Sequence, residues 1–202
     1  MIDRLFETLE AFNENNIVIP PRDGFEYTEP NTGLLEWMPI MRRGQKATIK
    51  LVGYHPTNPS LRNLPTILST ISMYDTTNGH LIGIADATFL TALRAGAASA
   101  VASKMMASPD AKTVGLIGCG AQAVTQLHAL SRVFDIEMVL AYDIDPCVCH
   151  NFADRTAFLD LNIQAAPAEV VVRMSDILCT ATSVEIHEGP VFEDTETKPW
   201  LH

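Results

Sequence analysis

The sequence predicts an α/β protein, with a doubly wound parallel sheet in the second half preceded by an α+β region in the first. Three observations support this prediction. Residues 114–117 form a short apolar run, as expected of a parallel strand that is buried on both faces. A glycine-rich turn follows directly, and strands and helices then alternate up to residue 181. This order is typical of a Rossmann-type sheet, which we expect to be incomplete because residues 198–202 lead towards a further strand.

The turn at residues 118–123 reads GCGAQA and follows the G-x-G-x-x-G/A pattern. Gly118 and Gly120 permit a tight turn and let backbone N–H groups approach a pyrophosphate, and the helix that begins here adds its positive dipole end. The next strand ends at Asp143, 23 residues after Gly120, where a carboxylate accepts hydrogen bonds from the adenosine ribose. This favours NAD over NADP. The alternative is that Asp143 is only a turn residue, since Asp145-Pro146 already makes a good helix start.

Composition excludes several classes of partner. The net charge of −10, without a basic run, argues against nucleic acid or an anionic membrane. Four cysteines without a paired framework indicate free thiols in a reducing compartment, so we expect a cytoplasmic protein. The Cys147-x-Cys149-His150 run has no second ligand pair at zinc spacing, so no metal site is expected. No apolar run reaches membrane-spanning length, and the first residues do not form a signal peptide.

Periodicity gives the remaining elements. In the first half we expect an amphipathic helix over 2–12, an extended stretch over 17–21, strands over 34–41, 47–54, 66–74 and 81–85, a hairpin turn over 75–79, and a small-residue helix over 88–107. In the second half we expect strands over 114–117, 138–141, 163–165 and 177–181, and further helices over 146–160 and 167–174. The predicted boundary lies near residues 108–112, which gives domains 1–110 and 111–202.

Three cations stand out. Lys50 lies in an apolar strand pattern, where an unpaired ammonium is costly to bury, so an anionic partner is expected. Arg94 shares a helical stripe with apolar residues and is expected to need an anion too. Arg22 follows two prolines. Each cation has a simpler explanation, as a side chain that reaches solvent from a strand edge, a helix surface or a loop. A pyrophosphate and an amino-acid carboxylate are the anions that would use them.

With these residues in place, the chain resembles the ornithine cyclodeaminase/mu-crystallin family over nearly its whole length. Five stretches carry the resemblance: 35–39 (LEWMP), 50–56 (KLVGYHP), 88–102, 118–122 (GCGAQ) and 177–183. The resemblance implies a first half that binds substrate and forms the dimer, and a second half that binds NAD.

The resemblance also implies roles for individual residues. Arg22 and Lys50 would hold the substrate α-carboxylate with Arg94 close by, and Glu36 would orient an amine or assist proton transfer. The implied cofactor site comprises Thr66, Arg94, Gly118, Gly120, Ala121, Gln122, Asp143 and Thr182. The family's catalytic aspartate follows a strand beyond Trp200, so we expect the 202 residues to be a fragment that lacks its acid/base and is inactive alone.

Family members differ in chemistry, which includes cyclodeamination of ornithine or lysine, imine and ketimine reduction, alanine dehydrogenation and ligand binding without catalysis. Glu36 and the run 53–58 (GYHPTN) look closer to the cyclodeaminases. The resemblance therefore predicts conversion of ornithine to proline and ammonia, in which hydride leaves Cα for NAD and returns to the cyclic imine. An imine reductase or alanine dehydrogenase and a crystallin-like binding protein are the alternatives. The partners expected are an amino-acid or imino-acid substrate and a second copy of the chain.

Overall fold

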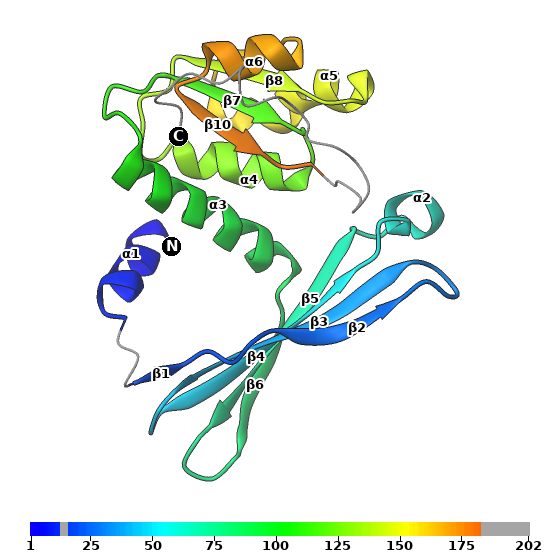
Figure 1. Cartoon of the computed structure of the whole chain (residues 1–202), viewed down its shortest axis with the longest axis vertical. Helices are drawn as coiled ribbons and strands as arrows, with labels where there is room; N and C mark the ends of the chain where they lie inside the picture. Colours follow the sequence, from blue (N-terminus) through cyan, green and yellow to red (C-terminus); the bar gives the residue numbers. More distant parts are fainter. Residues whose placement is uncertain (13–15, 183–202) are drawn as a thin grey trace. The chain divides into compact units, whose positions relative to one another are not determined.

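The computed structural model describes residues 1–12 and 16–182. Contacts divide the chain into two compact units, one formed by Met1–Glu7 with Ala92–His202 and the other by Thr8–Thr91. Both kinds of sheet that the sequence predicts are present (Figure 1). The predicted fold class is thus confirmed, whereas the functional division at residue 110 stays a prediction. The contacts place the division near Thr91 because most of helix α3 (Thr88–Met106) packs with the second half.

The Thr8–Thr91 unit is built on an antiparallel sheet of six strands. Along the sheet they run β1-β3-β4-β5-β6, and β2 also pairs with β3. The strands are β1 (Ile17–Val18), β2 (Asp23–Tyr27), β3 (Gly33–Arg42), β4 (Lys46–Tyr54), β5 (Ile67–Asp75) and β6 (Leu81–Asp86). The predicted hairpin turn between β5 and β6 is confirmed, since Gly79 has φ +75° and donates its N–H to the Asp75 carbonyl at 2.9 Å.

Three elements of this unit were not predicted. Strand β1 is too short to show a periodicity, and β2 (DGFEY) carries glycine and two acids, which disfavour a strand. Both are held by pairing to the long strand β3. Helix α2 (Asn58–Arg62) is a single turn, begins with a proline at its first positions, and ends at Asn63 in the left-handed region.

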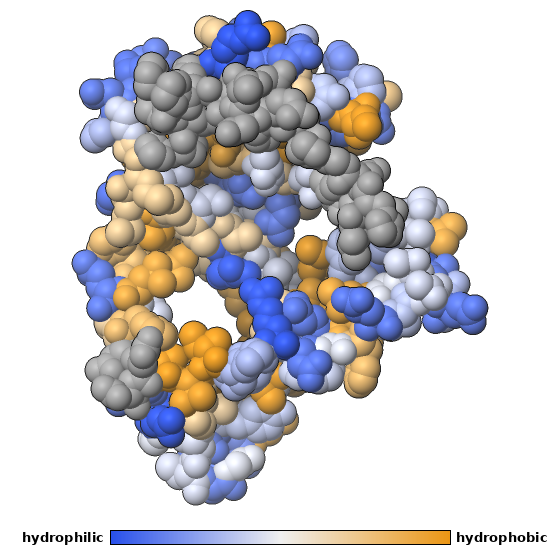
Figure 2. Space-filling model, viewed as in Figure 1, coloured by the Kyte–Doolittle hydropathy of each residue, from blue (hydrophilic) through white to orange (hydrophobic). Residues whose placement is uncertain are grey.

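The two faces of this sheet differ in chemistry. Residues directly opposite in an antiparallel pair point to the same face. The register Phe25↔Leu35↔Gly53↔Leu68 therefore places these four residues on one face. That face also carries Trp37, Ile49, Leu51 and Ile84. Phe25, Ile49, Leu51, Leu68 and Ile84, the apolar set, are each more than a third exposed. Figure 2 shows exposed apolar residues in the region where Figure 1 draws this sheet.

The other unit contains a parallel sheet in the order β10-β7-β8-β9. Its strands are β7 (Thr113–Ile117), β8 (Met138–Tyr142), β9 (Ile163–Ala165) and β10 (Ile177–Thr180). Helices α4 (Ala121–Leu130) and α5 (Pro146–Arg155) share one core with this sheet, around Leu127 and Phe152. Helix α6 (Ala168–Met174) packs through Val171 and Val172 in a second core on the opposite face (Figure 1). The sheet is therefore covered on both faces, as predicted.

The helix predicted over 146–160 is shorter, because α5 ends at Arg155 and a 3₁₀ turn, Ala157–Leu159, follows. The hydroxyl of buried Thr156 donates to the Phe152 carbonyl at 2.7 Å, and the backbone of Asp160 is in the left-handed region. These features end the α-helix early.

Helix α3 approaches α4 closely, as its small residues predict. A Cβ added to Gly96 would lie 2.2 Å from the Thr125 carbonyl oxygen. Only glycine, which has a hydrogen atom in place of a side chain, fits this contact. The opening helix is also confirmed, as α1 (Ile2–Glu10).

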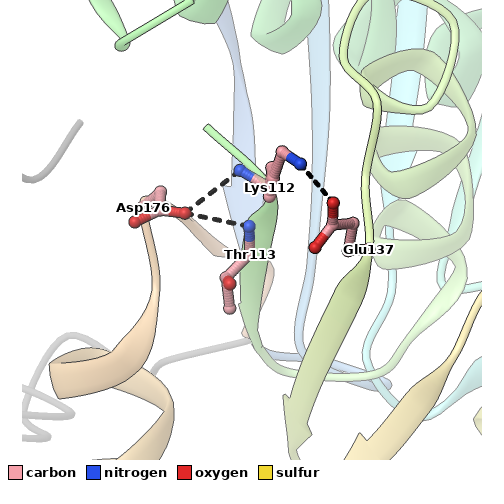
Figure 3. Close-up of polar contacts among 4 residues, drawn as sticks. All are labelled: Lys112, Thr113, Glu137 and Asp176. Atoms are coloured by element: carbon pink, nitrogen blue, oxygen red, sulfur yellow. Dashed lines mark hydrogen bonds and ion pairs between the residues drawn. The ribbon is translucent and has the colours of Figure 1, made fainter. Parts of the chain in front are cut away.

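A polar clamp holds the amino-terminal ends of the parallel strands (Figure 3). Asp176, just before β10, accepts hydrogen bonds from the backbone N–H groups of Lys112 and Thr113 at 3.1 and 3.0 Å. The Lys112 ammonium in turn pairs with Glu137, just before β8. Three strands are thereby tied at one edge. No helix among the described residues is long and apolar enough to cross a membrane.

Candidate functional site

The glycine turn lies at the carboxyl edge of the parallel sheet, between β7 and α4. Gly118 has φ +91°, a conformation that favours glycine. A Cβ at this position would also lie 2.7 Å from the carbonyl oxygen of Ala181, the residue after β10. Only glycine therefore fits here. Ala181 donates its N–H to the Ile117 carbonyl at 2.7 Å, so the ends of β7 and β10 meet at the turn.

This edge is also the switch point of the sheet. The chain runs outward from β7 through β8 to β9 and then returns to place β10 on the other side of β7. In doubly wound sheets, ligands bind outside the carboxyl ends of the strands at such a point. Gly118, Asp143 and Thr182 follow β7, β8 and β10 in turn, so the structure gathers these predicted cofactor residues at one edge.

The residues of the turn fit a dinucleotide. Gly120 is the N-cap of α4, and no side chain caps this helix end. Among the described residues, no heavy atom other than those of Gly120 and its chain neighbours lies within 4 Å of a Cβ built on Gly120. Ala121 is exposed, and the side-chain oxygen of Gln122 is buried without a partner in the described part of the chain. A pyrophosphate would receive the backbone N–H groups and the helix dipole here.

Asp143 already organises the turn. One carboxylate oxygen accepts the Cys119 N–H at 2.7 Å and the other accepts the Asp145 N–H at 2.9 Å. Asp143 therefore stabilises the turn, and its role at the ribose stays a prediction. A carboxylate has about four lone-pair sites, so two remain for hydroxyl groups.

Arg155 is a contributor to the turn that the sequence did not reveal. From the end of α5 its guanidinium donates to the Cys119 carbonyl. It also lies over the Phe152 ring, 5.5 Å from the centroid. Arg155 lies 36 positions after Cys119, and no sequence pattern links an arginine at that distance to a glycine turn.

Three of the predicted substrate-site residues belong to the Thr8–Thr91 unit, on the sheet face opposite the apolar set. Glu36 pairs with Val52, two residues from Lys50, so Glu36 and Lys50 are diagonal neighbours on one face. Such neighbours have Cα atoms about 7–8 Å apart. Arg22 precedes β2, and its Nη1 lies 3.9 Å from Glu36 Oε2. We call Arg22, Glu36 and Lys50 the polar triad.

Burial differs within the polar triad. The side chain of Arg22 is 64% exposed, that of Glu36 is 22% exposed, and Lys50 is half-buried. Glu36 is thus the more enclosed partner of its ion pair, with one cation beside it and a second on the same face.

Thr66 lies just before β5 and is held by the 50–56 motif. The His55 N–H donates to the Thr66 carbonyl at 2.8 Å, and His55 Nε2 lies 2.7 Å from the Tyr27 hydroxyl. Gly33 admits these rings, because a Cβ there would approach both to within 2.8 Å. His55 therefore has a positioning role that motif matching alone did not explain.

The sequence places Arg94 on a helical stripe with Leu90, Ala97, Ala98 and Val101, and the structure confirms only part of that stripe. Arg94 is exposed, and so is Leu90 of the same predicted stripe. The buried side of α3 is formed by Gly96, Ala97, Ala100, Val101 and Ser103. The predicted stripe is only partly right because residues 95–103 are small except for Val101, which leaves the periodicity of the buried face weak. A role for Arg94 at an anion stays a prediction.

Apart from Thr66 and Arg94, the predicted site residues fall into two groups. Gly118, Gly120, Ala121, Gln122, Asp143 and Thr182 lie at the carboxyl edge of the parallel sheet, in one unit. Arg22, Glu36 and Lys50 lie together in the other. Among the described residues, no cluster of His, Cys, Asp or Glu is suited to a metal ion.

Comparison with known proteins agrees with this geometry. The chain is 43% identical over 183 residues to L-lysine cyclodeaminase of Streptomyces rapamycinicus, covering 91% of this chain and 53% of that protein. It thus spans about half the length of this curated relative. A solved structure described for recognition of L-lysine, L-ornithine and L-2,4-diaminobutyric acid by lysine cyclodeaminase superposes with a TM-score of 0.91 and 47% identity. The match covers 100% of this chain and 59% of that one.

Two further structures are similar. Thermococcus litoralis Δ1-pyrroline-2-carboxylate reductase, in complex with NADH and L-proline, has a TM-score of 0.80 and 35% identity, over 90% of this chain and 55% of that one. An archaeal alanine dehydrogenase dimer with bound NAD has a TM-score of 0.78 and 34% identity, over 90% and 54%. These two structures contain NADH and NAD, and such a cofactor fits the turn described above.

The profile of one protein family matches residues 1–202, the whole chain. Both halves contribute, the glycine turn as well as the sheet that carries the polar triad. The chain belongs to the ornithine cyclodeaminase/mu-crystallin family.

Proposed function

We propose that the complete gene product is a cyclodeaminase that acts on a basic α-amino acid, with NAD as a cofactor that is regenerated in each turnover. Ornithine is the substrate that the sequence favours, and the likeness to lysine cyclodeaminase makes L-lysine the second candidate. The first would yield proline and the second its six-membered homologue, pipecolate, each with ammonia.

The observation that carries this proposal is the position of Glu36 in the polar triad. A site for a simple carboxylate would need only cations, and an acid beside them would repel the ligand. Glu36 lies 3.9 Å from Arg22 and on the same sheet face as Lys50. An acid among two cations suits a zwitterion that carries a carboxylate and at least one ammonium group.

The chain's own residues would act mainly by positioning. Lys50 and Arg22 would hold the α-carboxylate so that Cα is presented to the cofactor, and Glu36 would hold an amine or accept a proton from it. Arg94 and Thr66 are proposed to contact the cofactor, together with the turn residues. NAD, when bound, supplies a reversible hydride acceptor.

The test is incubation of the complete gene product with L-ornithine or L-lysine, with and without added NAD. We expect cyclic amino acid and ammonia in equal amounts and no net reduction of NAD. Absence of both products with both substrates would refute the proposal.

Variants make the test specific to the polar triad. Lys50→Met should raise KM and lower kcat/KM, because it removes a carboxylate contact worth about 1.5–3 kcal/mol. Lys46→Met is the matched control, since Lys46 is an exposed lysine on the same strand, four residues away. Glu36→Gln keeps the shape and should weaken selection for a diamino acid over alanine.

The second candidate is an NAD(P)H-dependent imine reductase or an alanine dehydrogenase, favoured by the likeness to the pyrroline-carboxylate reductase and the alanine dehydrogenase. Such an enzyme would consume its cofactor stoichiometrically, which absorbance at 340 nm would report. A crystallin-like binding protein would bind NAD and the ligand without turnover.

We also propose a homodimer in the cytoplasm. The apolar set is exposed on one sheet face, and such a face is typical of a protein interface. All four cysteines are free, which suits a reducing compartment. Light scattering should give twice the monomer mass for the complete protein, and Leu51→Lys should lower it. A monomer at micromolar concentration would contradict the dimer.

A further inference from the structure

Two thiols meet beside the glycine turn. Cys119, between the two glycines, is fully buried, and Cys149 on α5 is half-buried and packs against the same core. Cys149 lies close enough to help raise the pKa of the Cys119 thiol. Each sulfur also contacts a carbonyl at the end of β8, with Cys119 Sγ 3.5 Å from the Tyr142 oxygen and Cys149 Sγ 3.4 Å from the Ala141 oxygen. Both sulfurs therefore lie at the carboxyl end of β8, next to the glycine turn.

We infer that Cys119 and Cys149 form a reversible disulfide that weakens NAD binding at the glycine turn, so that the pair is a redox switch on the cofactor site. The inference rests on NAD binding at this turn and goes beyond the proposed reaction, since neither thiol takes part in it.

Hydrogen peroxide is a sufficient oxidant. The Cys149 thiolate attacks one peroxide oxygen, the O–O bond breaks, and the departing hydroxide leaves as water with a proton, which gives a sulfenic acid. Cys119 sulfur then attacks that sulfur, an S–S bond forms, the S–O bond breaks, and the second water takes the Cys119 proton. The two thiols lose two electrons in total, and peroxide is reduced to two waters.

The order of attack follows from burial. Burial raises the pKa of the Cys119 thiol to about 12, helped by Cys149 and Asp143 nearby. At neutral pH this thiol is protonated and enclosed, so it does not meet the oxidant first. Cys149 is partly open to solvent and starts the reaction.

The cross-link would disturb the turn because the sulfurs must approach. A disulfide sets them about 2.05 Å apart, closer than two unbonded sulfur atoms can approach. Cys119 cannot move alone, since its N–H donates to Asp143 at 2.7 Å and its carbonyl accepts from Arg155. Movement of Cys119 towards α5 would therefore shift Asp143, the proposed ribose ligand, and also the backbone N–H groups that would face the pyrophosphate.

The experiment uses the complete protein, either reduced or treated with hydrogen peroxide. Peptide mass spectrometry reports the cross-link, and calorimetry with NAD reports affinity. We expect a peptide joining Cys119 to Cys149, with a mass lower by two hydrogens, and an NAD Kd raised about tenfold, as loss of one charged hydrogen bond would give. A thiol reductant should restore both.

Two variants isolate the pair. Cys149→Ser should bind NAD normally when reduced and should lose the response to peroxide. Cys147→Ser is the matched control, because Cys147 is exposed on the same helix and it should respond as the unchanged protein does.

Three outcomes would overturn the inference: no Cys119–Cys149 peptide, a cross-linked protein with unchanged NAD affinity, or a Cys149→Ser variant that still loses affinity in peroxide. Failure of the reduced protein to bind NAD would instead refute the proposed function, and the mass measurement keeps the two cases apart.

Discussion

Helices α3 and α4 cross at Gly96, where an added Cβ would come closer to another part of the backbone than at any other described glycine. Adding a single methyl group at this position tests the contact. Helix propensity alone predicts that Gly96→Ala stabilises the protein by about 1 kcal/mol. The added Cβ, however, would lie 2.2 Å from the Thr125 carbonyl oxygen and 2.6 Å from its carbon. Forcing a methyl into a packed site costs about 1–3 kcal/mol. Both atoms are backbone and cannot rotate away, so we take the upper end and expect a net loss of about 2 kcal/mol.

Urea unfolding followed by circular dichroism measures this loss. With a slope of about 2 kcal/mol per molar urea, the midpoint should fall by about 1 M. Gly83→Ala in β6 is the control, since a Cβ there meets no atom of the described residues within 4 Å, and its midpoint should not fall. A Gly96→Ala protein as stable as the original would show that the two helices separate at no cost, and the reasoning from close packing would be refuted.

Three further predictions concern single carboxylates. Asp143→Asn weakens the acceptor for the Cys119 N–H and for ribose, so calorimetry should show an NAD Kd raised about tenfold. Asp176→Ala leaves two backbone N–H groups of the clamp without an acceptor, so the free energy of unfolding should fall by about 1–3 kcal/mol while NAD affinity is unchanged. Hydrogen bonds from the Thr77 side chain and N–H lower the pKa of Asp75 below its ordinary 3.8. Its contribution to stability is therefore complete above that value and lost as pH falls through the lower folded pKa, so urea midpoints of Asp75→Asn should decline less steeply below about pH 4.

The elements that the sequence predicts well are those whose burial shows in local pattern. Residues 114–117 are apolar because β7 is covered on both faces, and the glycine pattern is local because one tight turn needs it. Strand β2 lacks such a pattern, because it is held by backbone pairing to β3 and buries little. The stripe that includes Arg94 is predicted poorly because residues 95–103 of α3 are small except for Val101, so several faces of the helix could be the buried one.

Some residues of the candidate site can likewise be predicted from local sequence, and others cannot. Gly118 and Asp143 lie 25 positions apart, but each carries a spacing rule that sequence alone can apply. Arg155 and Cys149 reach the same turn through side chains from α5, and only the packed structure reveals them. The ion pair of Arg22 with Glu36 likewise depends on β2, an element that was not predicted.

Alternation along β3 and β4 determines both the polar face and the apolar face of the sheet in the Thr8–Thr91 unit. Glu36 and Lys50 occupy even positions and share a face, whereas Ile49 and Leu51 occupy odd positions on the other. A slip of one residue between these strands would turn the acid and the lysine to opposite faces and mix charge into the apolar set. Burial of the apolar set against a second copy would therefore penalise the slipped register, because a lysine would then enter the interface. Self-association would in this way protect the geometry that the proposed substrate site requires.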